Sequence, residues 1–167
     1  MRADRQAEQT SYRGVTRAGI FLGLGLGGFF DGIVLHQILQ WHHMVTERYP
    51  VTSIENLQIN TVGDGLFHAL TYVFTATGIF LLWRTLQGQH RPLPVRVLLG
   101  AMLMGWGLFN LVEGLINHHL LQIHHVRSGP NEMAWDVAFL AWGAAMLMIG
   151  WLVNRPHPKP LSQRRGA

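Results

Sequence analysis

Four long apolar runs constrain this chain more than any other feature, and they lie at about residues 18–41, 61–83, 96–121 and 133–153. At about 1.5 Å per helical residue, each run is long enough to cross a hydrocarbon core of roughly 30 Å. Inside lipid a helix satisfies its backbone hydrogen bonds within one segment. The runs therefore predict an all-α fold, a bundle of four transmembrane helices in a lipid bilayer, occupying residues 18–153 as one domain.

The few charged residues predict how the bundle is oriented. Only 13% of residues are charged, about half the usual fraction for a soluble domain. Eleven of the thirteen Lys and Arg residues lie in residues 1–17, around residues 85–95 or in residues 154–167. Short basic segments between apolar runs follow the positive-inside rule and do not indicate nucleic-acid binding. We expect both termini to be cytoplasmic, residues 1–17 to form a polar N-terminus and residues 154–167 a disordered basic tail.

The most distinctive motif occurs twice. Asp31–His43 returns as Glu113–His125, shifted by 82 positions (113 − 31). Each copy has an acid, glycine, three residues, histidine, three residues, glutamine, one residue and a His-His doublet. A weaker match lays Asp64–Ala69 on Asp136–Ala141, with His68 opposite Leu140. The repeat predicts two helical hairpins, arranged as parallel repeats about an axis along the membrane normal.

Both motifs place acids and histidines in or beside spanning segments, where such groups are costly. With α-helical geometry, Gly32, His36, Gln40 and His43 share one side of the first helix. The expected depth puts His36 in a buried layer in the outer half of the membrane and the doublets at the outer interface. Because no Lys lies within a span and Arg occurs only at a span end, a buried carboxylate there must be protonated, hydrogen-bonded to histidine or bound to a cation.

Imidazoles and carboxylates in a chain without cysteine suit copper, zinc or iron. The candidate metal ligands are His36, His42, His43, Asp64, His68, Glu113, His118, His119, His124 and His125. The candidates for orienting those ligands through hydrogen bonds are Asp31, Gln40, Gln122 and Asp136. Interfacial anchoring and a proton-conducting network of histidines and carboxylates are the alternatives to a metal site.

The chain resembles a family of small, histidine-rich bacterial membrane proteins with four spans, a domain of unknown function. The strings that carry the resemblance are Phe30–Gly32, Leu35–His43, Asp64–His68, Asn117–His119 and His124–His125. The family is sometimes joined to, or encoded near, a cytochrome oxidase assembly factor that handles copper. The resemblance thus implies the bacterial inner membrane, ranks copper before iron and zinc, and suggests a respiratory oxidase or its assembly factor as partner.

Several functions fit this pattern, and the sequence leaves open whether the protein is an enzyme. Copper handling in the outer half of the bilayer is the first. A membrane metalloenzyme is the second, either a di-iron oxygenase or a zinc hydrolase with Asp64 or Glu113 as base. A haem protein with His36 and His118 as axial ligands is the third, although it leaves the doublets without a role. A homo-oligomer is compatible with each.

Overall fold

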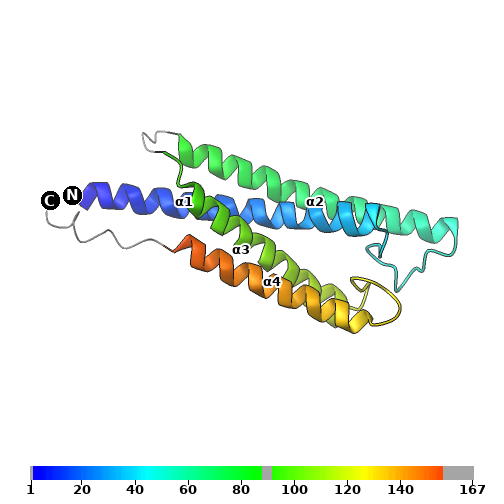
Figure 1. The fold of residues 1–167 in the computed structure, drawn as a ribbon. Coiled ribbons are helices and arrows are strands. Elements are labelled where there is room, and N and C mark those ends of the chain that lie inside the picture. Colours follow the sequence, from blue (N-terminus) through cyan, green and yellow to red (C-terminus); the bar gives the residue numbers. More distant parts are fainter. Residues whose placement is uncertain (1, 88–91, 156–167) are drawn as a thin grey trace.

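The computed structural model describes residues 2–87 and 92–155 (Figure 1). The regular segments in these ranges are all helical: α1 (Arg2–Phe30), η1 (Asp31–Ile38), α2 (Ile54–Leu86), α3 (Val95–Glu113), η2 (Gly114–Leu120) and α4 (Glu132–Asn154). The segments η1 and η2 are π-helices that continue α1 and α3 without a break. Four spans are long and apolar enough to cross a membrane: Gln9–Ile38, Ile54–Leu86, Val95–Leu120 and Glu132–Asn154. The predicted all-α fold with four spans is confirmed.

The helices extend beyond the predicted runs at several ends. α1 is already helical at Arg2, within the polar N-terminal segment. α2 begins at Ile54, because the Ser53 hydroxyl caps the helix by accepting a hydrogen bond from the Asn56 amide at 3.2 Å. The predicted apolar run, in contrast, begins only at about residue 61. Most of the predicted tail, from residue 156, and residues 88–91 of the predicted basic loop lie outside the described residues.

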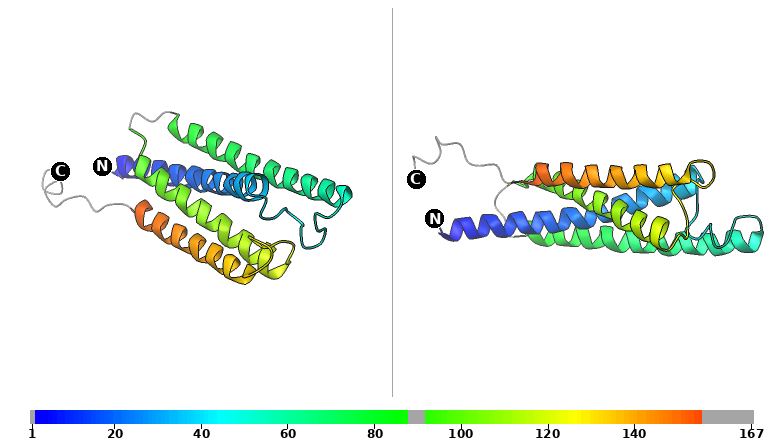
Figure 2. Two further views of the ribbon diagram at one scale, coloured as in Figure 1. Left: turned by 45° about the vertical axis from the view of Figure 1, so that its right-hand side comes forward. Right: turned by 90° about the horizontal axis from the view of Figure 1, so that it is seen from below.

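The four helices stand in a row, with α1 and α3 in the centre, α2 against α1 and α4 against α3 (Figures 1 and 2). Within the most apolar window of each span, 56% of residues are buried in the α1–η1 segment but only 11% in α2. The outer helices therefore turn most of their apolar surface away from the protein. Both motif ends and the two loops that follow them lie at the end of the molecule opposite to the start of α1 and the end of α4 (Figure 1).

Glycines set the distance between α1 and α3. A Cβ on Gly23 would lie 2.0 Å from the Met102 carbonyl oxygen, and one on Gly105 would lie 2.1 Å from that of Ile20. Gly105 follows Gly23 by 82 positions, and Met102 follows Ile20 by the same number. The two contacts are therefore the same contact made twice, about a pseudo-twofold axis between α1 and α3. This arrangement confirms the parallel repeats.

Candidate metal centre

The π-helical segments bring each acid onto the histidine that follows it by five residues. Backbone hydrogen bonds from residue i to i+5 widen the helix, so residues five apart stack along one side. His36 Nε2 lies 3.3 Å from Asp31 Oδ2, and His118 Nε2 lies 3.1 Å from Glu113 Oε2. A regular α-helix would separate the members of each pair around its circumference. The local π-helix is thus what builds each acid–histidine pair.

The backbone leaves the helix in the same way at the end of both copies of the motif. Gln40 has φ 49° and Gln122 has φ 47°, a left-handed conformation that turns the backbone sharply. The turn carries His42 and His124 back into the protein, where they are only 2% and 1% exposed. The predicted α-helical side shared by His36 and Gln40 therefore does not form. Gln40 and Gln122 are exposed, and the first histidine of each doublet is buried instead of interfacial.

Four imidazoles meet at the centre, two from each repeat. The rings of His42 and His124 are stacked, with centroids 4.6 Å apart and planes inclined by 6°. His36 packs edge-on against His42 at 4.3 Å, and His118 packs edge-on against His124 at 4.9 Å. The ring pairs thus follow the same pseudo-twofold axis as the glycine contacts. We call these four residues the histidine cluster.

Three of the four rings in the histidine cluster are oriented by hydrogen bonds from Nδ1. His42 Nδ1 donates to the carbonyl oxygen of Val126 at 2.8 Å, and His124 Nδ1 donates to that of Met44 at 3.0 Å. These two bonds cross between the repeats, so the loop of one hairpin orients the histidine of the other.

The other two rings lie against aspartates of the outer helices. His36 Nδ1 donates to Asp64 Oδ1 at 2.9 Å, whereas His118 Nδ1 lies 3.3 Å from Asp136 Oδ1 and makes no hydrogen bond among the described residues. Carbonyls and carboxylates only accept hydrogen bonds, so the bonds of His36, His42 and His124 place a proton on Nδ1. In the neutral ring Nε2 is then a free electron pair, the form that binds metals.

The Nε2 atoms of the cluster either lie near carboxylate oxygens or have no hydrogen-bond partner among the described residues. His124 Nε2 lies 2.8 Å from Glu113 Oε1. Among the described residues, the buried Nε2 atoms of His36 and His42 have no hydrogen-bond partner. Burial, reinforced by the nearby His124 and His36, lowers the pKa of His42 well below its ordinary value, so this ring stays neutral. An electron pair facing a carboxylate oxygen requires a proton or another cation between them.

Among residues 2–87 and 92–155, the four acids of the spans form ion pairs only with histidine. Asp31 and Glu113 contact Nε2 atoms of the cluster, and Asp64 and Asp136 contact Nδ1 atoms. The two aspartates of the outer helices each receive further hydrogen bonds in matching positions. Asp64 accepts from His43 Nδ1 at 2.7 Å and from the Met44 amide at 2.9 Å. Asp136 accepts from His125 Nδ1 and the Val126 amide at the same two distances.

Two overlapping groups of side chains could hold a metal ion. One ligand atom from each of His36, His42 and His124 lies within 4.8 Å of the others, and the same is true of Glu113, His118 and His124. The remaining predicted ligands have other positions. His43 and His125 bond to the outer aspartates, and His68 donates from Nδ1 to the Asp64 carbonyl while its Nε2 side faces Gly32.

His119 lies beside the cluster without joining either group, and its buried Nε2 has no hydrogen-bond partner among the described residues.

The sequence did not indicate several other groups that shape the site. The carbonyls of Met44 and Val126 orient two rings, but a backbone group leaves no trace in residue type. Gln37 donates to Asp64 Oδ2 at 3.0 Å. Asn60, fully buried, holds the loop after the first motif by accepting from the Val45 amide and donating to the Tyr49 carbonyl. Asn60 could have been identified from the sequence, because it is a polar residue one helical turn before Asp64.

Fold and site together define an integral membrane protein of four helices, with a histidine and carboxylate cluster between two repeated hairpins. The chain belongs to the family described as predicted membrane protein (DUF2243), whose model matches residues 18–157. This match confirms the resemblance to a family of membrane proteins. No curated protein and no solved structure matches the chain.

Proposed function

We propose that this protein binds a transition metal ion between its two repeats, in the outer half of the bilayer, and that its function is copper handling. The observation that carries the proposal is the orientation of the histidine cluster. Three of the four rings, His36, His42 and His124, donate from Nδ1 to a carbonyl or carboxylate oxygen, which leaves their Nε2 as the metal-binding atom. Such outer partners fix the tautomer and position of metal-binding histidines in known sites.

The spacing of the donors supports the proposal. Imidazole nitrogens bind zinc and similar ions at about 2.0–2.1 Å, so two ligands of one ion lie at most about 4.2 Å apart. The donor atoms of each group lie within 4.8 Å of one another. Shifts of well under 1 Å would bring three of them onto one ion. The described residues therefore fit a metal ion with little rearrangement.

Charge also supports a bound cation. Asp31 and Glu113 are 3% and 6% exposed, and neither pairs with Lys or Arg in the described part of the chain. Two uncompensated carboxylates inside a membrane protein are strongly unfavourable. A divalent ion among the Nε2 atoms would neutralise both. Protons on the histidines are the alternative, and they correspond to the proton-conducting network.

The donor set ranks the candidate metals. Imidazole suits copper, zinc and iron, and a site with three imidazole ligands binds Cu(II) more tightly than Fe(II) or Zn(II). We therefore place copper first, then iron or zinc. The family resemblance supports the same order, with a respiratory oxidase or its assembly factor as the partner that receives the metal.

The two enzyme hypotheses and the haem hypothesis receive less support. The rings of His42 and His124 lie between His36 and His118, so a porphyrin cannot be held by the latter two as axial ligands. The two groups of donors share His124, which favours one ion over a di-iron pair. A zinc hydrolase would use Asp64 or Glu113 as its base, but each of these carboxylates already contacts two histidine rings.

The test is metal content of the purified protein in detergent, measured before and after loading with Cu(II) or Zn(II). Replacing His42 or His124 by glutamine should lower the bound metal at least tenfold and should reduce the number of nitrogen hyperfine lines in a Cu(II) EPR spectrum. The matched control is His68→Leu, since the second repeat has Leu140 at this position, against Gly114, just as His68 lies against Gly32. Unchanged metal binding in both glutamine variants would refute the metal site.

Orientation requires its own test. The distribution of Lys and Arg supports cytoplasmic termini and a cluster at the outer face. At residue 50, a fused reporter that works only outside the cytoplasm should therefore be active, and one that works only in the cytoplasm should be inactive. A cytoplasmic signal there would move the cluster to the inner face and would exclude delivery of metal on the outer side.

A further inference from the structure

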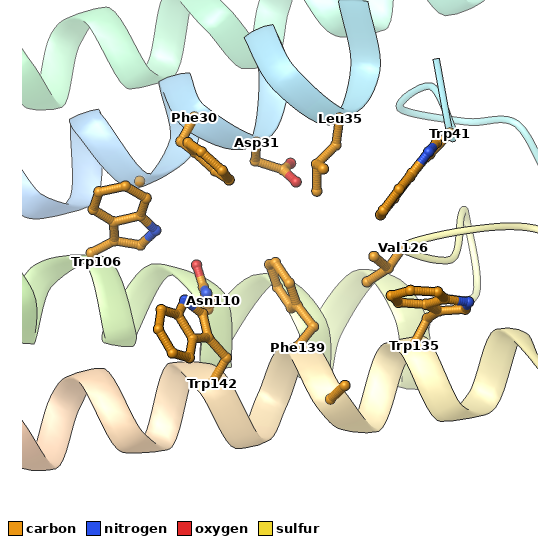
Figure 3. Close-up of a pocket in the computed structure, with 12 residues that line it drawn as sticks. Phe30, Asp31, Leu35, Trp41, Trp106, Asn110, Val126, Trp135, Phe139 and Trp142 are labelled. Atoms are coloured by element: carbon orange, nitrogen blue, oxygen red, sulfur yellow. The ribbon is translucent and has the colours of Figure 1, made fainter. Parts of the chain in front are cut away.

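An aromatic cavity of about 220 Å³ lies beside the histidine cluster, between the α1–η1 segment and the α3–α4 hairpin (Figure 3). Four of the chain's six tryptophans line it, together with two phenylalanines: Trp41, Trp106, Trp135, Trp142, Phe30 and Phe139. An apolar cavity of about 150 Å³ is enough to bind benzene. This cavity can therefore take one substituted aromatic ring.

Two buried polar groups point into the cavity from opposite sides, the Asp31 carboxylate and the Asn110 amide (Figure 3). Each residue is only 3% exposed. The Asn110 side chain has no hydrogen bond within the described part of the chain, although a buried amide normally finds a partner. Asp31 also contacts His36, so its carboxylate belongs both to the cavity and to the cluster. A ligand with a polar substituent would satisfy Asn110.

The aromatic lining breaks the repeat that the histidines keep. The residues equivalent to Trp41, Trp106, Trp135 and Trp142 in the other half are Ile123, Leu24, Gly63 and Leu70, and the equivalent of Asn110 is Gly28. The fold of a hairpin therefore needs neither the tryptophans nor the amide. These residues distinguish one side of the pseudo-twofold axis, which indicates a role for that side alone.

An interfacial belt explains only part of this lining. Trp41 and Trp135 lie at the loop end, with the Arg127 guanidinium 5.3 Å and 5.7 Å from their ring centroids, as expected at a membrane surface. Trp106 and Trp142 lie about halfway along their spans, where a belt does not reach. Trp142 is 61% exposed and Phe30 46% exposed, so the cavity opens sideways between helices. A ligand would enter from the bilayer and must be soluble in lipid.

We propose that this cavity binds the ring of a lipid-soluble phenol or hydroquinone. The indole and phenyl side chains pack against the ring. One ring hydroxyl donates a hydrogen bond to the Asp31 carboxylate, and the Asn110 amide contacts the polar substituent. The bound hydroxyl would then contact Asp31, which itself contacts His36 of the histidine cluster. This proposal goes beyond metal binding and does not require it.

The test uses 2,3,5-trimethylhydroquinone and the full-length protein in detergent, with binding measured by calorimetry under argon. We expect one ring per chain. The dimethyl ether of the same compound should bind at least tenfold more weakly, because it cannot donate to a buried carboxylate. Trp106→Leu and Trp142→Leu, which copy the other repeat, should each weaken binding at least tenfold. Trp83→Leu, at the far end of α2, is the matched control and should bind as the wild type does.

Equal affinity for the hydroquinone and its ether would overturn the proposal, and this comparison needs no variant. Unchanged binding in both leucine variants would overturn it as well. Metal content measured on the same samples keeps the two proposals apart. Metal without ring binding contradicts only the cavity proposal, whereas ring binding in a protein that takes up no metal contradicts only the metal proposal.

Discussion

The contact between α1 and α3 provides the sharpest test of the repeat. In Gly23→Ala the new methyl group would lie 2.0 Å from the Met102 carbonyl oxygen and 2.8 Å from the Trp106 amide nitrogen. Cβ atoms essentially never approach closer than 3.0 Å, so the backbone of α3 must move by at least about 1 Å. Both neighbours belong to the main chain and cannot rotate away. The two repeats must therefore separate.

The expected cost is that of overpacking, about 1–3 kcal/mol. Alanine also gains about 1 kcal/mol over glycine in a helix, which partly hides this cost. Gly65→Ala removes that ambiguity, because nothing lies within 4 Å of its new methyl group. The difference between the two variants isolates the packing term. For a chain of this size it corresponds to a melting temperature roughly 2–12 °C lower for Gly23→Ala than for Gly65→Ala.

Thermal unfolding in detergent measures the difference, and Gly105→Ala should reproduce it because it makes the equivalent contact. Separation by 1 Å would also lengthen the crossed bonds of His42 and His124, now 2.8 Å and 3.0 Å. Metal content should therefore fall with stability. If Gly23→Ala melts at the same temperature as Gly65→Ala, the close approach of α1 and α3 is wrong.

Three further predictions concern the site and its loops. Asp64→Asn and Asp136→Asn should each weaken metal affinity by about 10–100-fold, as loss of an orienting partner does, with the exposed Glu47→Gln as control; equal affinities in all three would contradict the orienting role. Gln40→Gly should raise the melting temperature, because glycine adopts the observed φ of 49° without strain, and a lower melting temperature would contradict this backbone turn. Asn60→Ala should cost about 1–3 kcal/mol by leaving the Val45 amide without its partner, whereas Asn56→Ala should cost less; urea unfolding distinguishes them.

Much of this architecture could be predicted because its signals are local or repeated. Four apolar runs are readable one by one, and the 82-residue shift relates the two hairpins directly. Asp64 and Thr71 are seven residues apart, which puts them on one side of a helix, and this side of α2 faces α1, with Thr71 packed against Gly28. Each of these inferences depends on side-chain type and regular spacing alone.

The details of the site depend on backbone conformation, which the sequence does not display. Asp31 and His36 are five residues apart, a spacing that pairs them only in a π-helix. The left-handed Gln40 and Gln122 are not glycines, so no residue type marked the turn that buries the first histidine of each doublet. Depth counted along an ideal helix consequently placed His42 beyond His36, whereas the two rings are in contact, with centroids 4.3 Å apart. The aromatic cavity was equally hidden, because its lining comes from three spans and two loops.

Because the bonds to Met44 and Val126 cross between the repeats, neither hairpin contains a complete site. Each half contributes two rings and two acids, and each half also completes the orientation of a ring in the other. In this respect the centre is a dimer interface carried within one polypeptide. A single hairpin that paired with its own copy would present the same donors in the same symmetry. When two such units are joined in one chain, each can differ in sequence from the other. The two repeats do differ at His68 opposite Leu140 and at Trp142 opposite Leu70.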